Sequence, residues 1–167
     1  MKATLKLENG RELTVDVNEE TLKQIEKPAK KTGYEFVEDG EDHYIIPGDK
    51  GLFEASKNTS YDLDAYEKAN YYSDKTVAEN NARADTLMRK LRRFAVEHRE
   101  TGLDWEGFAD KFYIEYNYEG NSLETDCDCT YRGFGKIYFD SNETAQAAIE
   151  EFKDELLWYF TEYKDSL

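Results

Sequence analysis

The sequence has few of the residues that form linkers and metal sites. Two prolines and ten glycines in 167 residues leave little room for long linkers. The two histidines, His43 and His98, lie far in sequence from the two cysteines, Cys127 and Cys129, so the ligand spacing of a zinc site is missing. Both cysteines fall in one predicted strand, where alternate residues do not have the geometry of a disulfide, and reduced cysteines are typical of a cytoplasmic protein.

The motifs of the common enzyme classes are also missing. There is no Walker loop, no glycine pattern of a dinucleotide-binding fold, no zinc-protease motif and no nucleophile elbow. No apolar run approaches membrane-spanning length, and the first residues lack the apolar core of a signal peptide. We therefore expect a cytoplasmic protein that is not an enzyme, with no catalytic residues, no cofactor, no metal and no membrane contact.

Charge of one sign is abundant. Asp and Glu number 37 against 22 Lys and Arg, which gives a net charge of −15. Such a chain repels nucleic acid and anionic membranes and attracts basic partners, although solubility alone is the alternative explanation. Thirteen tyrosines and nine phenylalanines argue against disorder, and a chain of this length buries enough surface to fold without a metal or a disulfide.

Residues 1–32 are predicted to form a small N-terminal ββα unit. Apolar and polar residues alternate on both sides of Asn9-Gly10, a dipeptide that suits a type I′ hairpin turn because both positions need positive φ. Asn18 caps a predicted short helix that Pro28 ends or kinks.

The next part of the chain is rich in short β-prone runs, followed by a long helical pattern. Strands are predicted at 34–37, 43–46, 52–55 and 70–72. The polar segment Lys57–Tyr66 is predicted as a loop. Ser73 or Asp74 begins the longest predicted helix, which runs to about Arg99, because apolar residues recur there at helical spacing.

The segment Phe112–Tyr163 organises the rest of the prediction, as strand, turn, strand, strand and helix. Apolar and polar residues alternate on both sides of the turn at Glu119–Ser122, which is the period of a half-buried strand. The last helix is predicted from about Ser141 to Tyr163, with Asp140 and Glu143 at a start that resembles a capping box.

These elements predict an α+β fold, with antiparallel hairpins packed against two long helices. Tyr71–Asp74 leads into the first long helix and Tyr138–Ser141 leads into the second. Residues 33–167 therefore read as one domain of two meander-plus-helix halves. A degenerate duplication explains this echo, and so does the general frequency of aromatic strand ends and polar helix caps.

A row of carboxylates on the predicted hairpin is the first candidate site. Its members are Glu115, Glu119, Glu124, Asp126 and Asp128. Alternate strand residues lie about 7 Å apart, close to the spacing of phosphates along one DNA strand. The row therefore predicts a surface that imitates nucleic acid in a basic groove; a solvated sheet face and a hard-cation site are the alternatives, although an EF-hand pattern is absent. Tyr113 and Tyr118, near strand ends, are the candidate interface aromatics.

A basic face is the second candidate site. Arg83, Arg89, Arg92 and Arg93 lie on the long predicted helix. The charge is unevenly distributed, since residues 112–167 carry 4 basic and 13 acidic residues. The arginines either contact nucleic acid, an acidic partner or a second copy, or they form a solvated helix face.

Three segments resemble small accessory proteins of phages and prophages of Gram-positive bacteria. They are Tyr71–Glu79, Gly135–Ser141 and Phe152–Phe160. The resemblance covers about residues 40–165, and the N-terminal unit resembles a short extension on similar phage proteins. Acidic phage proteins of this kind include anti-CRISPR proteins, so the resemblance implies a cytosolic inhibitor of bacterial immunity and supplies no catalytic residues.

Together these patterns predict a phage-encoded inhibitor of a bacterial defence nuclease, a CRISPR effector above all, that binds by its acidic hairpin. Its expected partner is a defence protein with a basic groove, and we expect no direct binding of nucleic acid. The alternative is a phage regulatory module that uses the arginine helix to bind nucleic acid or to dimerise. The sequence indicates no oligomeric state.

Overall fold

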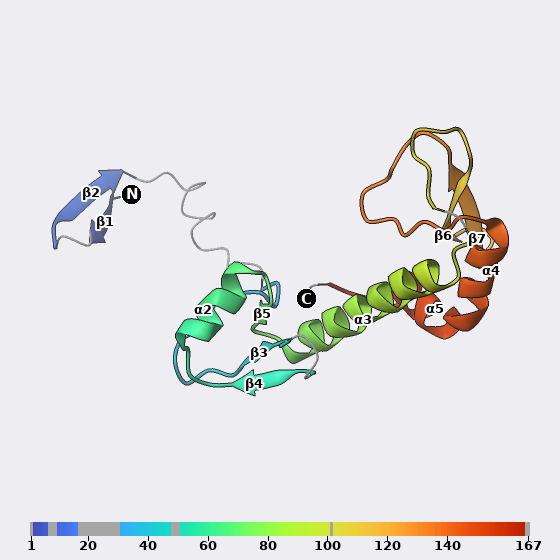
Figure 1. Ribbon diagram of the computed structural model, residues 1–167. Coiled ribbons are helices and arrows are strands. Elements are labelled where there is room, and N and C mark those ends of the chain that lie inside the picture. The colour runs from blue at the N-terminus through green and yellow to red at the C-terminus, as the bar shows by residue number, and fades with distance from the viewer. Residues whose placement is uncertain (1, 7–9, 17–30, 48–50, 101, 166–167) are drawn as a thin grey trace. The chain divides into compact units, whose positions relative to one another are not determined.

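The computed structural model describes residues 2–6, 10–16, 31–47, 51–100 and 102–165. The chain forms two compact units, Met1–Lys31 and Thr32–Leu167. The described residues contain four helices and small antiparallel sheets (Figure 1), which confirms the predicted α+β class.

The N-terminal unit contains an antiparallel hairpin of β1 (Lys2–Lys6) and β2 (Glu12–Asp16). Leu5 pairs with Leu13, and Gly10 has a φ of +78°, which glycine adopts without strain. The predicted helix from Asn18 to Pro28 lies outside the described residues, as does Asn9 of the predicted turn.

The second unit begins with a three-stranded sheet and a helix. β3 (His43–Ile45) lies between β4 (Phe53–Ala55) and β5 (Tyr71–Tyr72). Helix α2 (Ser60–Glu67) occupies most of the segment predicted as a loop, so that prediction was wrong. This helix buries little apolar surface, and a capping box explains why it forms. The Thr59 side chain accepts a hydrogen bond from the Asp62 backbone N–H, and the Asp62 side chain accepts one from the Thr59 backbone N–H.

Helix α3 (Lys75–Glu97) connects two hydrophobic clusters. Asp74 caps it by accepting a hydrogen bond from the Val77 N–H at 2.9 Å. Its first turns pack Val77 and Ala78 beneath the three-stranded sheet. Its later turns place Leu87, Leu91 and Ala95 in the larger cluster of the C-terminal half. In Figure 1, α3 runs from the β3–β5 sheet at one end to the C-terminal hairpin and helices at the other.

The C-terminal half is a hairpin backed by two helices. Strand β6 (Lys111–Asn117) pairs antiparallel with β7 (Ser122–Asp128). The helix predicted from Ser141 to Tyr163 is two helices, α4 (Asn142–Glu151) and α5 (Lys153–Thr161). The break is at Phe152, whose φ of −114° and ψ of 22° are not helical.

Two other local predictions in this half were wrong. The third strand is a single antiparallel bridge in which Phe139 N–H donates to the Phe112 carbonyl at 2.7 Å. The cap of α4 is Ser141, whose side chain accepts from the Thr144 N–H, and not the capping box suggested by Asp140.

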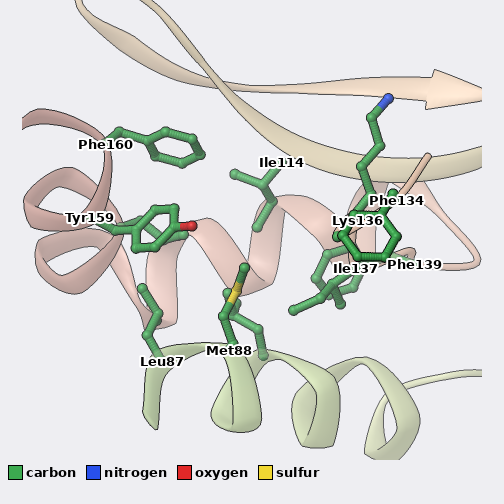
Figure 2. Close-up of a pocket in the computed structure, with 12 residues that line it drawn as sticks. Leu87, Met88, Ile114, Phe134, Lys136, Ile137, Phe139, Tyr159 and Phe160 are labelled. Carbon is green, nitrogen blue, oxygen red and sulfur yellow. The ribbon is translucent and has the colours of Figure 1, made fainter. Parts of the chain in front are cut away.

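Contacts between α3 and α5 complete the core. Leu87, Phe139 and Leu156 are almost fully buried in the larger cluster. The Arg83 guanidinium lies 3.8 Å from the centroid of the Trp158 ring, a cation–π contact between the two helices. A groove of about 330 Å³ remains between α3, α5 and β6, and Figure 2 shows Met88, Ile114 and Phe160 pointing into it.

The carboxylate of Glu35 links the start of the second unit to Ser73 by hydrogen bonds. Glu35 accepts hydrogen bonds from the Thr32 hydroxyl at 2.9 Å, the Gly33 N–H at 3.1 Å and the Ser73 hydroxyl at 2.7 Å. The Ser73 hydrogen bond, followed by the Thr32 backbone, lowers the pKa of Glu35 from 4.5 to about 2. Because the folded state holds the charged form, this carboxylate stabilises the fold above its ordinary pKa of 4.5.

We expect Glu35→Gln to lower the melting temperature at pH 7, with a difference from the unaltered protein that shrinks as the pH falls from about 4.5 towards about 2. Thermal unfolding followed by circular dichroism between pH 2 and pH 7 measures this. The control is Glu38→Gln, an exposed neighbour. A Glu35→Gln deficit that is equally large at pH 2 and pH 7 contradicts the assigned role.

Candidate functional site

The C-terminal hairpin has one apolar and one polar face. Ile114 and Leu123 pack against the larger hydrophobic cluster with Phe112. The strand register places Glu115 opposite Glu124 on the other face. The apolar face therefore fixes the hairpin on the helices and turns the acidic side chains away from that core.

One end of the polar face is covered by the loop that follows β7. The Lys136 ammonium lies 3.3 Å from the centroid of the Tyr113 ring and 2.9 Å from a carboxylate oxygen of Asp128. The Tyr138 hydroxyl donates to the same oxygen at 2.7 Å. The hydrogen bond from Lys136, then that from Tyr138, lowers the pKa of Asp128. The charge of Asp128 is therefore matched within the chain.

The other end of the polar face is open and carries what we call the acidic ridge. It consists of Glu115, Glu119, Glu124 and Asp126, of which all but the half-buried Glu124 are exposed. Glu124 accepts from the Asn117 amide at 3.0 Å and from the Ser122 hydroxyl at 2.7 Å. These hydrogen bonds hold the Glu124 carboxylate in place without cancelling its charge.

Asp126 is held in a similar way. It accepts a hydrogen bond from the Tyr113 hydroxyl at 2.8 Å and one from the Cys127 N–H at 2.8 Å. The Tyr113 hydrogen bond, followed by the Cys127 backbone, lowers the pKa of Asp126. The ridge therefore keeps this negative charge at mildly acidic pH.

The structure places the predicted site residues in three groups. Four of the five predicted acids form the ridge, whereas Asp128 is paired with Lys136. Tyr113 departs from its expected interface position, because the loop after β7 covers it and leaves it 8% exposed. Tyr118 remains an exposed aromatic at the turn, where its hydroxyl donates to the Phe160 carbonyl at 3.0 Å.

The predicted basic face is divided among several local contacts. Arg83 stacks on Trp158, and Arg93 lies 3.8 Å from Glu97. Arg89 donates to the Thr86 hydroxyl at 3.0 Å. Arg92 lines a separate cavity. All four arginine side chains are exposed, and three of them also make contacts within the chain.

Sequence reasoning missed the loop residues that shape the site. Lys136 neutralises Asp128 and Tyr138 donates a hydrogen bond to it, although they lie 8 and 10 residues away in sequence. The available signal was Gly133 and Gly135, which interrupt the β-pattern and allow the chain to turn back over the hairpin. Gly135 has a φ of +81°, as such a turn requires.

The register creates an unfavourable contact that a substitution should relieve. Like charges directly opposite in a sheet are destabilising, and Glu115 faces Glu124. We expect Glu115→Lys to raise the free energy of unfolding by about 0.5 kcal/mol. Urea denaturation measures it, with Glu54→Lys as control, since Glu54 lies opposite Tyr44. A loss of stability in Glu115→Lys contradicts the repulsion.

No known family model, curated protein or solved structure matches this chain. Among the described residues, no group of three or more histidine, cysteine, aspartate or glutamate side chains has an arrangement that would hold a metal ion. None of the described helices is both long enough and apolar enough to cross a membrane.

Proposed function

We propose that this protein is an inhibitor without enzymatic activity that binds another protein, and that its acidic ridge occupies the partner's basic, nucleic-acid-binding groove. The observation that carries the proposal is that the exposed Glu115 lies opposite the half-buried Glu124 on the hairpin, with no cation of the described chain paired to either. Their repulsion in the free protein is relieved when a cation of the partner comes between them.

The geometry of the ridge suits a groove that normally holds a phosphate backbone. Directly opposite strand residues lie about 5 Å apart and alternate residues about 7 Å apart, close to the spacing of phosphates. Asn117, Ser122 and Tyr113 hold two of the carboxylates in place before binding. A surface that is ordered in advance loses less conformational entropy when it binds.

The proposed partner is chosen from the charge and from the resemblance stated in the sequence analysis. A net charge of −15 favours a basic partner and accelerates association with it. The resemblance to accessory proteins of phages supports a bacterial defence nuclease, with an RNA-guided CRISPR effector as the first candidate, in the cytosol of the host. The alternative, nucleic-acid binding or dimerisation through the α3 arginines, has less support because Arg83 and Arg93 are engaged within the chain.

Binding and inhibition assays with purified RNA-guided nucleases test the proposal. We expect binding of the unaltered protein to weaken steeply between about 50 mM and about 500 mM salt, because the contacts are between charges. Replacing Glu115, Glu124 and Asp126 together by glutamine or asparagine should weaken binding at least about tenfold.

The matched control removes the same charge elsewhere. Glu54, Glu67 and Glu106 are exposed, and replacing them by glutamine should leave binding within about threefold of the unaltered protein, since only long-range attraction is lost. If both triple variants weaken binding equally, binding depends on the net charge of the protein and not on the acidic ridge. A gel shift with DNA or RNA that lacks a terminal phosphate, or a dimer in light scattering, supports the α3 alternative instead.

A further inference from the structure

A second cavity lies between the C-terminal part of α3 and the loop after β7. Its volume is about 330 Å³. Its described lining contains four cationic side chains, Arg92, Arg99, Arg132 and Lys136, and no aspartate or glutamate. The chain as a whole has 37 acidic and 22 basic residues, so the positive charge of this cavity is opposite in sign to the net charge of the protein.

Three of these cations have no counter-ion among the described residues. Within the described part of the chain, no carboxylate lies within ion-pair distance of Arg92, Arg99 or Arg132, whereas Lys136 is paired with Asp128. Arg99 is half-buried, and its Nε atom is buried with no hydrogen-bond acceptor among the described residues. A buried donor without an acceptor is rare in folded proteins, so Arg99 keeps a donor that a ligand could use.

One wall of the cavity places an aromatic ring beside Arg132. The Arg132 guanidinium lies 5.6 Å from the centroid of the Trp105 ring, and Tyr138 packs edge-on against the same ring at 4.9 Å. The half-buried Trp105 and the buried Tyr138 also line the cavity. The site therefore combines an apolar wall with several donors, which is the usual composition of a small-ligand site.

We propose that this cavity binds the phosphate group of a small phosphate monoester. Guanidinium groups match phosphate oxygens with paired hydrogen bonds, and a dianion balances two of the three unpaired arginines. A cavity of about 330 Å³ is at the small end for ligand sites, which favours a mononucleotide-sized ligand over a folded polymer. This site is separate from the acidic ridge, so it stands or falls independently of the proposed function.

The experiment titrates the full chain with inorganic phosphate, a ribonucleoside monophosphate and a 5′-phosphorylated oligonucleotide in separate arms. Calorimetry gives the affinity, and nuclear magnetic resonance follows the Nε–H signal of Arg99, which should shift as its missing acceptor arrives. Strongest binding of the nucleoside monophosphate identifies a nucleotide as the source, and strongest binding of the oligonucleotide identifies the end of a strand.

Two variants and one control make the test specific. Arg99→Gln and Arg132→Gln should each weaken binding at least about tenfold, because each removes charge-assisted hydrogen bonds. Arg89→Gln removes the same charge from an exposed position on α3 outside the cavity and should change affinity by less than about twofold. Arg132 is exposed, so its variant is informative even if Arg99→Gln fails to fold. The proposal is overturned if the Nε–H signal of Arg99 does not shift with any of the three ligands. It is also overturned if Arg99→Gln, Arg132→Gln and Arg89→Gln all bind the ligand with equal affinity.

Discussion

Replacing Phe139 by alanine is expected to lower the free energy of unfolding by about 4 kcal/mol. The Phe139 side chain is 1% exposed and belongs to the larger hydrophobic cluster, so its removal loses transfer free energy and leaves a cavity. The backbone bridge to Phe112 remains, so the loss reports the side chain. Urea denaturation followed by circular dichroism measures it.

The control for this variant lies in the same loop. Phe134 is fully exposed, and Phe134→Ala should change the free energy of unfolding by less than about 0.5 kcal/mol. If Phe139→Ala lowers the free energy of unfolding by less than about 1.5 kcal/mol, the Phe139 side chain does not contribute to the larger hydrophobic cluster as described.

The second large effect is expected at Asp62. Its side chain is buried and accepts hydrogen bonds from the Thr59 N–H, the Thr59 hydroxyl and His43 Nε2. Asp62→Ala leaves the buried His43 without its carboxylate acceptor and removes the Asp62 half of the capping box of α2. We expect a loss of about 3 kcal/mol in the free energy of unfolding.

An exposed acid on the same helix is the control for Asp62. Asp64 pairs with Lys68 on the surface, and Asp64→Ala should cost less than about 1 kcal/mol. Burial raises the pKa of Asp62, but the hydrogen bonds from Thr59 and His43 outweigh it and lower the pKa overall. The contribution of Asp62 is therefore present above its ordinary pKa of 3.8 and lost as the pH falls further. Equal losses for both variants at pH 7 contradict this account.

Much of the local structure could be predicted where a pattern and a boundary signal agree. Alternation around Asn9-Gly10 and around Glu119–Ser122 predicts hairpins, and both are present among the described strands. Helical spacing after Asp74 predicts α3 together with its cap. In each case, local chemistry alone decides the element.

Helix α2 could not be predicted from apolar periodicity. Its buried residues are Asp62 and Ala65, so it has almost no apolar face. Its signal is the cap formed by Thr59 and Asp62, and Asp62 also contacts His43, which is 19 residues away. Such a helix is identified by its cap and its tertiary contact rather than by its period.

The candidate site depends on contacts between distant segments. The run around Phe152 contains no proline or glycine that would announce the break between α4 and α5. The fold of the loop over Tyr113 decides which carboxylates remain open, and that fold follows from the packing of Tyr138 against Trp105 and Tyr113. The sequence alone therefore predicted the row of acids but not its shortened extent.

The continuous helix α3 has a consequence for cooperativity. Its 23 residues extend about 35 Å, with one hydrophobic cluster at each end. The two clusters share its backbone hydrogen bonds, so residues 32–167 should melt in a single transition. A partner that binds the β6–β7 hairpin should then slow amide hydrogen exchange in β3 and β5, at the other end of α3, although it does not contact these strands.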